Sequence, residues 1–384
     1  MTSGALNIEP ALTALAAALG GEGPAVELSA GPDGSPVVAL VEAPGVEDAA
    51  VVVRTSGSTG TPKATVLTLD ALAASSMATA LALRGEGQWL LALPVQYVAG
   101  VQVLVRSLFA GTRPWAMDLS GGFTPEAFTA AALELTDKIR FTSLVPTQLQ
   151  RLLDSPSTET LAVLRRFNGI LLGGGPAAPE LLAAARDAGV RVVTTYGSAE
   201  TCGGCVYDGV PLEGVVVRVA EDGRILLGGA TIAAGYLDAP ELSAEAFVAD
   251  GGVRWYRTND IGELDADGKL TVLGRADDVV ITGGVKVSAA HVQAELEKLD
   301  GVRAAFVAGV PSAEWGQALA AYVALADSSP EGLEGFSAGA PWAPALGALA
   351  PKTVLAAAEL LMLPNGKPDR LSMTVRLTEL HQGK

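Results

Sequence analysis

Residues 55–63 read Thr-Ser-Gly-Ser-Thr-Gly-Thr-Pro-Lys, so four hydroxyl side chains and two glycines fill the first six positions of a loop that ends in lysine. Glycine lets the backbone aim its N–H groups at a nearby anion, and the hydroxyls and the lysine add donors and positive charge. Such a loop is suited to hold phosphate groups. The residues that we expect to do so are Thr55, Ser56, Gly57, Ser58, Thr59, Gly60 and Lys63.

The flanking residues separate this loop from the phosphate loop of P-loop nucleotide hydrolases. That motif needs Ser or Thr directly after the lysine and a helix just downstream. Here Ala64 follows Lys63, residues 65–68 are mostly β-branched, and the valine run at residues 51–53 predicts a buried strand. The loop is therefore predicted to join strand to strand. A plain surface turn is the other alternative, and it is disfavoured because such turns seldom combine this hydroxyl density with Pro-Lys.

Four further motifs follow the loop. Residues 196–200 read Tyr-Gly-Ser-Ala-Glu, and residues 256–260 read Tyr-Arg-Thr-Asn-Asp. Residues 274–287 contain Gly-Arg-Ala-Asp-Asp and Gly-Gly-Val-Lys-Val, and residues 364–370 read Pro-Asn-Gly-Lys-Pro-Asp-Arg. In kind and order, the five motifs resemble those of adenylate-forming enzymes, which include acyl-CoA and aryl-CoA ligases, carrier-protein adenylation domains and luciferases. Because all five motifs occur in the order in which the family has them, a chance match is negligible.

The composition excludes several classes of protein. A formal net charge of −16 disfavours general nucleic-acid binding. The longest apolar stretches, such as residues 318–326, are far too short for a membrane span, and the N-terminus lacks the basic region of a signal peptide. Two cysteines provide no disulfide framework. We therefore expect a cytoplasmic protein that acts on small molecules without inserting into a membrane. The sequence leaves a homo-oligomer open.

Short apolar segments alternate with Ala-rich segments, a pattern that predicts α/β layers. Strands are predicted at residues 90–93 and 190–195, and helices at residues 10–19 and 179–188. The resemblance implies a large N-terminal domain with a shortened N-terminus and a small mobile C-terminal domain that carries the hinge and the catalytic lysine. The glycine and charge at residues 274–277 place the boundary, so the domains are predicted at residues 1–274 and 275–384.

The predicted C-terminal domain reads as α+β. Ser288 is expected to cap a helix that Gly301 ends, and residues 302–310 and 318–325 read as strands. The stretch at residues 327–344 is rich in Gly, Ser and Pro, which predicts a loop.

The resemblance implies two half-reactions. A carboxylate attacks the α-phosphorus of ATP to give an acyl-adenylate and pyrophosphate, and a thiol then displaces AMP. Lys367 matches the catalytic lysine, and a positive charge on its turn can stabilise the reacting carboxylate and phosphate together. Glu200 is expected to bind Mg²⁺, a cation that prefers oxygen ligands beside phosphates. A solvated turn lysine and a surface carboxylate are the alternatives.

The same resemblance assigns the rest of the nucleotide. Tyr196 is expected to stack on adenine, Asp260 to accept hydrogen bonds from the ribose hydroxyls, and Arg275 to support the ribose. Close backbone approach to ATP or AMP is expected at Gly174, Gly175 and Gly197. A core tyrosine and surface charges are the alternatives.

The hinge and CoA positions also follow from the resemblance. Asp277 matches the hinge about which the small domain rotates, and Gly283 and Gly284 would then line the approach of CoA. An ordinary loop aspartate is the alternative. Two positions depart from the family pattern, because Ala199 replaces Thr or Ser and Asn259 replaces Gly. Neither removes a charged group, so we expect quantitative effects rather than loss of activity.

Residues 94–108 bear on the choice of acid. They resemble the segment of o-succinylbenzoate–CoA ligases of menaquinone biosynthesis that ends in Arg-Ser after an aromatic-x-x-Gly stretch, although His is frequent where Tyr97 stands. Arg106 is expected to bind the second carboxylate of this diacid, and pairing with an internal carboxylate is the alternative. Tyr97 and Gly203 are expected to complete the acyl pocket.

Cys202 and Cys205 do not predict a metal site, since the remaining ligands would have to come from His291 and His381, both remote in sequence. Small residues that line the acyl pocket fit better. We predict ATP-dependent activation of o-succinylbenzoate, with Mg²⁺, followed by thioester formation with CoA. The alternatives are another aryl- or acyl-CoA ligase and a non-catalytic adenylate-binding protein.

Overall fold

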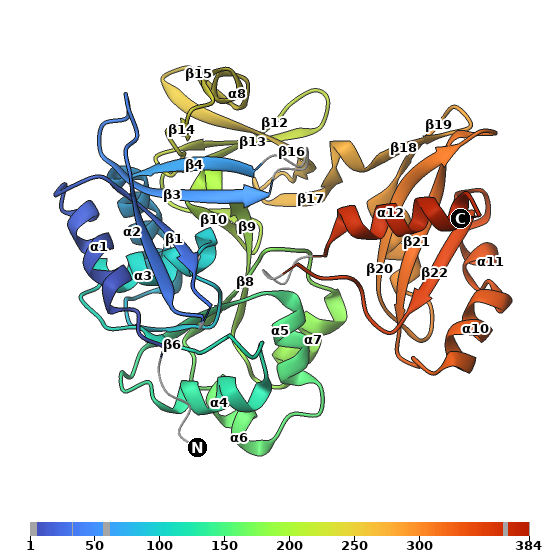
Figure 1. Cartoon of the computed structure of the whole chain (residues 1–384), viewed down its shortest axis with the longest axis horizontal. Helices are drawn as coiled ribbons and strands as arrows, with labels where there is room; N and C mark the ends of the chain where they lie inside the picture. Colours follow the sequence, from blue (N-terminus) through green and yellow to red (C-terminus); the bar gives the residue numbers. More distant parts are fainter. Residues whose placement is uncertain (1–5, 33, 57–61, 364–367, 384) are drawn as a thin grey trace. The chain divides into compact units, whose positions relative to one another are not determined.

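The computed structural model describes residues 6–32, 34–56, 62–363 and 368–383. The chain divides into two compact units (Figure 1). The first contains residues 1–220, 226–258 and 264–270, and the second contains residues 221–225, 259–263 and 271–384. Both units combine helices with sheets, as the predicted α/β and α+β classes require. The domain boundary at residue 274 stays a prediction.

The predicted phosphate loop follows the first strand of a hairpin. β3 (Ala49–Ser56) and β4 (Pro62–Thr68) pair antiparallel, and Thr55 lies opposite Lys63. The expectation that the loop joins strand to strand is therefore confirmed. The two strands belong to a five-stranded sheet with the order β14-β4-β3-β1-β2. The other members are β1 (Ala25–Ala30), β2 (Pro36–Val41) and β14 (Gly235–Tyr236).

A seven-stranded sheet, also in the first unit, has the order β11-β10-β9-β8-β7-β5-β6. The strands from β6 to β9 run parallel, whereas β10 and β11 pair antiparallel. The predicted strands at residues 90–93 and 190–195 correspond to β5 and β9, with shifted bounds. The bounds are Gln88–Leu91 (β5), Trp115–Ala116 (β6), Arg140–Leu144 (β7), Gly169–Leu172 (β8), Val192–Ser198 (β9), Gly203–Tyr207 (β10) and Val210–Pro211 (β11).

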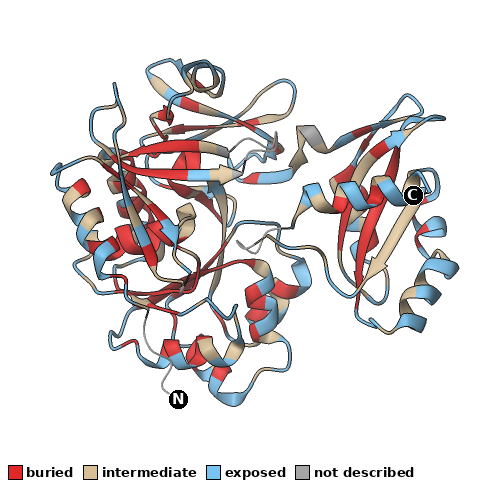
Figure 2. Ribbon diagram, in the orientation of Figure 1, coloured by how far each residue is buried: buried red, intermediate tan, exposed pale blue. Residues whose placement is uncertain are grey.

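Helices connect the parallel strands and bury their apolar sides against the sheet, so that the strands are largely buried in Figure 2. Their starts follow from the sequence: Thr124 accepts from the Ala127 amide and so caps α4, and Pro125 takes the first turn, where no amide donor is needed. The predicted helices at residues 10–19 and 179–188 are confirmed as α1 and α7. The bounds are Glu9–Leu19 (α1), Leu69–Leu83 (α2), Val98–Phe109 (α3), Pro125–Leu133 (α4), Pro146–Leu153 (α5), Thr158–Leu164 (α6) and Pro179–Asp187 (α7).

A third sheet of five strands has the order β12-β13-β16-β15, with β17 beside β16. Its strands are β12 (Val215–Val219), β13 (Arg224–Gly229), β15 (Phe247–Asp250), β16 (Val253–Leu264) and β17 (Leu270–Arg275), and α8 (Pro240–Ala246) precedes β15. In the part of the chain that the structure describes, no helix is both long enough and apolar enough to cross a membrane.

In the second unit, helices cover both faces of a sheet with the order β19-β18-β21-β20 and β22 beside β21. Along β21, Leu319 and Ala321 pack toward α9, whereas Ala320 and Tyr322 pack toward α12. Burial on both faces explains why residues 318–325 of this strand form an uninterrupted apolar run. The bounds are Val279–Thr282 (β18), Val285–Ser288 (β19), Val302–Ser312 (β20), Gly316–Leu325 (β21), Thr353–Ala357 (β22), Ala289–Glu297 (α9) and Arg370–His381 (α12).

Two predictions for this unit need correction. Residues 327–344 contain two helices, α10 (Pro330–Gly339) and α11 (Trp342–Leu346), instead of a loop. Ser329 caps the first of them, and the ring of Phe336 packs 5.3 Å from that of Trp342, so capping and apolar burial outweigh the glycine content. Ser288 does cap α9 as predicted, but this helix ends at Glu297, before Gly301.

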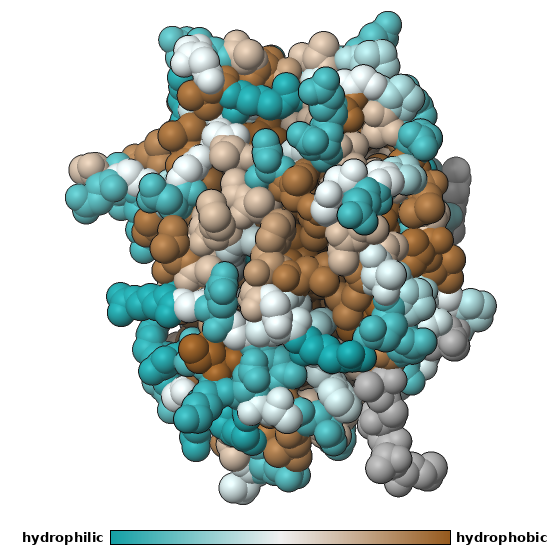
Figure 3. All heavy atoms as spheres, turned by 90° about the vertical axis from the view of Figure 1, so that its left-hand side faces the viewer, coloured by the Kyte–Doolittle hydropathy of each residue, from teal (hydrophilic) through white to brown (hydrophobic). Residues whose placement is uncertain are grey.

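A hollow of about 640 Å³ lies beside α1, on the side of the molecule that Figure 3 shows. It is lined by residues of α1, by residues 22–24 and by Leu40 of β2. None of the predicted site residues that the structure describes lines it, so this hollow does not correspond to the predicted site.

The core between the seven-stranded sheet and its helices gives a test of the packing. Phe128 of α4 is fully buried and contacts Phe123 and Phe167 at ring distances of 5.8 and 5.9 Å. Phe128→Ala should lower the free energy of unfolding by about 3–5 kcal/mol. Phe109→Ala is the control, because this ring is 41% exposed, and it should cost less than about 1 kcal/mol. Urea unfolding curves measure both free energies of unfolding. Equal losses in the two variants would contradict the buried position of Phe128 in this core.

Candidate active site

The parallel strands bring three predicted segments to one edge of the seven-stranded sheet. Residues 92–97 follow the carboxyl end of β5, and residues 173–175 follow that of β8. Tyr196 and Gly197 lie near the end of β9, which leads into the short helix η1 (Ala199–Thr201) with Glu200. In open α/β sheets, ligands bind outside the carboxyl ends of the strands. This edge is therefore the candidate active site of the first unit.

Lys63, Tyr236 and Glu200 form a chain of contacts. Lys63 Nζ lies 5.0 Å from the centroid of the Tyr236 ring, and the Tyr236 hydroxyl donates to Glu200 Oε1 at 2.9 Å. The strand register explains the first contact, because Tyr236 lies opposite Thr65, and Lys63 is on the same face of β4 as Thr65. The expected phosphate-binding lysine and the expected metal-binding carboxylate are thus joined through one tyrosine.

The sequence motifs did not point to Tyr236, because it lies outside all five of them. The signal for its position is the pairing of β14 with β4, which only the fold shows. Burial is the largest cause that raises the pKa of its phenol, and the nearby Glu200 and Tyr256 raise it further. The hydroxyl is therefore held protonated, so it can donate to the buried Glu200 carboxylate.

The glycines expected near the nucleotide have different reasons to be glycine. Gly174 has a φ of 85°, which side chains rarely adopt. A Cβ on Gly197 would lie 2.2 Å from the Gly203 carbonyl oxygen, so the packing of β9 on β10 requires glycine there. A Cβ on Gly175 would meet no described atom within 4 Å. Tyr196 is half-buried on β9, opposite Val206.

Arg106 of α3 is a buried charge, only 7% exposed. Its guanidinium lies 5.3 Å from the ring centroid of Trp89, and no described atom makes a hydrogen bond with its Nε. Among the described residues no carboxylate pairs with it, in contrast to the internal pairing considered from the sequence. A buried cation of this kind is costly unless an anion joins it.

The other expected acyl residues lie beside the same helix. Gly203 faces α3, since a Cβ there would lie 3.5 Å from Gln102 Cγ. Tyr97 precedes α3 as its N-cap residue, and burial raises the pKa of its phenol while a hydrogen bond with Gln96 lowers it. The sequence motifs did not single out Gln102, which hydrogen-bonds the carbonyl of Cys202.

Cys202 and Cys205 are fully buried. Burial raises the pKa of both thiols, to about 12 for Cys205, and the charge of Arg106 acts in the opposite direction on Cys202. Thiols in such surroundings are poor nucleophiles. Their packing fits the small-residue interpretation of this segment.

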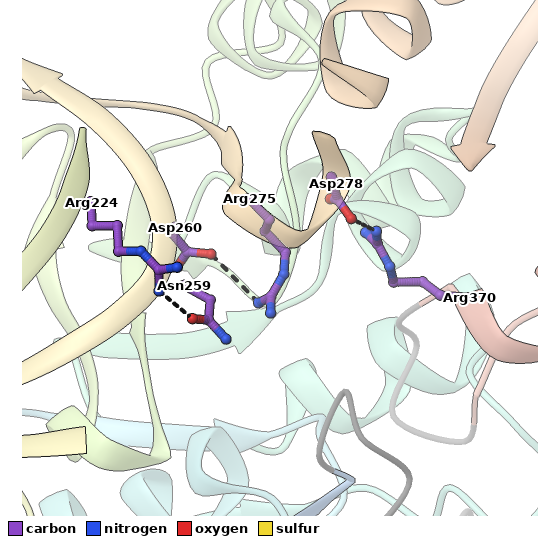
Figure 4. Close-up of polar contacts among 6 residues, drawn as sticks. All are labelled: Arg224, Asn259, Asp260, Arg275, Asp278 and Arg370. Atoms are coloured by element: carbon purple, nitrogen blue, oxygen red, sulfur yellow. Dashed lines mark hydrogen bonds and ion pairs between the residues drawn. The ribbon is translucent and has the colours of Figure 1, made fainter. Parts of the chain in front are cut away.

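Three polar contacts of the second unit are drawn in Figure 4. Arg275 Nη1 lies 3.5 Å from Asp260 Oδ1, so the two residues expected at the ribose are neighbours. Arg370, which ends the last motif, pairs with Asp278 and lies 5.3 Å from the ring centroid of Phe306. This pair connects the start of α12 to the short helix η2 (Ala276–Asp278), whose backbone includes Asp277.

The two departures from the family pattern have distinct settings. Asn259 Oδ1 accepts a hydrogen bond from Arg224 Nη1 at 2.8 Å (Figure 4). This exposed contact could not form with the glycine that is usual at this position. Ala199 is buried at the start of η1, next to Glu200.

Gly283 and Gly284 form the two-residue turn between β18 and β19, with φ values of 55° and 82°. Two positive φ values are typical of the tight hairpin turn that matches the strand twist. A Cβ on Gly283 would also lie 2.7 Å from Cε3 of Trp315. Local geometry therefore accounts for both glycines, and their contact with CoA stays a prediction.

Several expected site residues, or their side chains, lie outside the part of the chain that the structure describes. These are Gly57, Ser58, Thr59, Gly60 and Lys367, together with the side chains of Ser56 and Asp277.

The chain resembles known proteins along most of its length. A family model described as AMP-binding enzyme matches residues 15–237. A Mycobacterium tuberculosis protein named "Probable 2-succinylbenzoate–CoA ligase" is 44% identical over 286 residues, which are 74% of this chain and 73% of the relative.

Two solved structures are similar as well. The o-succinylbenzoate CoA synthetase (MenE) from Bacillus subtilis, in complex with the acyl-adenylate intermediate OSB-AMP, has a TM-score of 0.70 at 25% identity, over 84% of this chain and 68% of that one. ATP-bound MatB from Rhodopseudomonas palustris has a TM-score of 0.73 at 25% identity, over 92% of this chain and 75% of that one.

Tyr236→Phe tests the buried hydroxyl. Because the pKa of Tyr236 is higher in the folded than in the unfolded protein, its contribution to stability is complete below about pH 10 and declines progressively as the pH rises from there towards the folded-state pKa. In the folded wild type this buried phenol does not lose its proton up to about pH 11. Tyr236→Phe should therefore show as many titrating tyrosines as the wild type over this range. Phenolate absorbance measured against pH gives this number. If the variant has one titrating tyrosine fewer than the wild type, the Tyr236 hydroxyl is not buried as described.

Proposed function

Because the chain belongs to the family of AMP-binding enzymes, we propose that it activates a carboxylic acid with ATP and transfers the acyl group to CoA. This membership confirms the resemblance that the five motifs predict, and the similar structures confirm the fold class. We further propose that the acid is 2-succinylbenzoate, also called o-succinylbenzoate, since the relative from Mycobacterium tuberculosis bears the name of that ligase.

The observation that carries the substrate assignment is the buried guanidinium of Arg106, which has no carboxylate partner among the described residues. A charge taken out of water costs several kcal/mol unless an opposite charge and hydrogen bonds compensate it. A diacid provides this compensation, because one carboxylate is activated while the other pairs with Arg106. A plain fatty acid would leave the guanidinium unpaired.

The proposed chemistry has two steps. A carboxylate oxygen of the acid bonds to the α-phosphorus of ATP, and the bond to pyrophosphate breaks. The sulfur of CoA then bonds to the carbonyl carbon, and AMP leaves with the electron pair. Carboxylates are poor electrophiles, and adenylation gives them a good leaving group. The protein has to align the reactants and stabilise charge on the phosphoryl oxygens, and we assign the latter role to Lys367.

The remaining roles follow the matched motifs. We assign the triphosphate to residues 55–60 and Lys63, and Mg²⁺ to Glu200. The fit is chemical: Glu200 is a buried carboxylate oriented by Tyr236, and Mg²⁺ is usually held by one or two carboxylates together with substrate phosphates and water. We assign adenine to Tyr196 with Gly174, Gly175 and Gly197, the ribose to Asp260 and Arg275, the hinge to Asp277, CoA to Gly283 and Gly284, and the acyl group to Tyr97, Arg106 and Gly203.

A different acid is the second candidate, and Tyr97 favours it, because His is frequent at this position in ligases for o-succinylbenzoate. The test is CoA-dependent AMP formation with a panel of 2-succinylbenzoate, benzoate and a medium-chain fatty acid. We expect a strong preference for 2-succinylbenzoate. Preference for another acid would overturn the substrate, and turnover of none would favour a non-catalytic adenylate-binding protein.

Lys367→Ala tests the catalytic lysine. The variant should lose adenylation by at least about a thousandfold, in line with removal of a charge that stabilises the transition state. It should still form thioester from preformed acyl-adenylate and CoA. Lys298→Ala is the control, because Lys298 is an exposed lysine that pairs with Glu295 on α9. Equal loss in the two half-reactions would contradict the role assigned to Lys367.

Arg106→Gln tests the diacid site. Loss of a charge-assisted contact worth about 1.5–3 kcal/mol should raise the KM for 2-succinylbenzoate at least about tenfold. The KM for benzoate should rise much less. Arg151→Gln, at an exposed position of α5, is the control for removing one positive charge. Equal effects on both acids would make Arg106 a structural residue.

A further inference from the structure

Two buried polar side chains of α3 lie one helical turn apart, so they share one face of the helix. Gln102 is 1% exposed and Arg106 is 7% exposed. Each keeps one polar atom without a hydrogen-bond partner among the residues that the structure describes, Oε1 in Gln102 and Nε in Arg106. Unpartnered polar atoms at this depth are rare and indicate that another group completes their hydrogen bonds.

The orientation of the Gln102 amide follows from its surroundings. Its nitrogen Nε2 donates to the Cys202 carbonyl oxygen at 2.5 Å and to Ser75 Oγ at 3.2 Å, and Ser75 Oγ donates to the same carbonyl oxygen at 3.2 Å. The opposite orientation would place two acceptor oxygens against each other. The unpartnered Oε1 is therefore the amide oxygen, and the nitrogen holds the segment that leads from Glu200 to Gly203.

The neutrality of Gln102 has an electrostatic consequence for Arg106. A glutamate four residues before an arginine on a helix forms an ion pair with it, and Gln102 has the shape of glutamate without its charge. A carboxylate at this position would lie one helical turn from Arg106, and among the described residues no other carboxylate pairs with that buried guanidinium. Glutamine therefore leaves the positive charge of Arg106 available.

The expected acyl pocket adjoins this helix face. A Cβ on Gly203 would lie 3.5 Å from Gln102 Cγ and 3.9 Å from Val98 Cγ2, so the backbone of Gly203 lies against the same face. Gln102 thus lies against the segment that follows Glu200 and one helical turn before Arg106. This position lets it affect which acid the pocket accepts.

We propose that Gln102 is a specificity-determining residue, which keeps the Arg106 charge uncompensated and so selects acids with a second anionic group over monoacids. This inference rests on the proposed function. Gln102 is proposed to affect the selectivity between acids, and other residues are assigned to the adenylation step.

Two variants of nearly the same size separate charge from shape. Gln102→Glu and Gln102→Met both remove the amide that donates to the Cys202 carbonyl, while Ser75 still donates to it. Only the glutamate can neutralise Arg106. The readout is the ratio of the KM for 2-succinylbenzoate to the KM for 3-benzoylpropionate, a monoacid that lacks the ring carboxylate. Gln102→Glu should raise this ratio at least about tenfold, and Gln102→Met should raise it less than about threefold.

The controls concern charge and folding. Gln150→Glu adds the same charge at an exposed position of α5 and should leave the ratio unchanged. In an Arg106→Gln background, Gln102→Glu should lose most of its effect on the ratio, since the two residues act as a pair. If Gln102→Glu does not fold, Gln102→Asp brings the same charge on a shorter side chain and should shift the ratio in the same direction.

The outcomes distinguish this inference from the proposed function. If the wild type prefers the diacid but Gln102→Met shifts the ratio as much as Gln102→Glu, the charge argument is wrong and Gln102 acts through the Cys202 carbonyl. An unchanged ratio in both variants would overturn the inference as well. If the wild type turns over the monoacid and not the diacid, the proposed substrate is wrong, and the inference falls with it.

Discussion

The parallel alignment of β5, β7, β8 and β9 is the constraint on which the rest of the site depends. Because their carboxyl ends meet at one edge of the sheet, segments that are distant in sequence become neighbours there. The segment after β5 leads into α3 and Arg106, and the segment after β9 leads to Glu200. β4 and β14 then bring Lys63 and Tyr236 to Glu200. The site is thus a consequence of strand order.

Positive charge is scarce in a chain with a formal net charge of −16, although ATP, CoA and a diacid are all anions. Two of the cations expected at the site lie over aromatic rings, Lys63 over Tyr236 and Arg106 over Trp89. A ring face attracts a cation without neutralising it, unlike a carboxylate. Among the described residues neither cation pairs with a carboxylate. This arrangement keeps both charges for a ligand, whereas Arg275 and Arg370 of the second unit pair with aspartates.

Local patterns predicted more of the fold than of the site. The strands around the phosphate loop and the cap of α9 follow from β-branched runs and Ser288, which act over a few residues. α10 did not follow from composition, because the packing of Phe336 on Trp342 outweighs its glycines. Tyr236 lies outside every motif, Gln102 was not singled out within residues 94–108, and the partners of both come from distant segments of the chain. No local pattern contains that information.

The measurement that tests this account most directly is single-turnover release of pyrophosphate from ATP with 2-succinylbenzoate and no CoA. The account predicts about one equivalent of pyrophosphate per chain, since the acyl-adenylate accumulates when no thiol is present to remove AMP. A chain that binds ATP but releases no pyrophosphate with this acid or with any other of the panel would contradict the account.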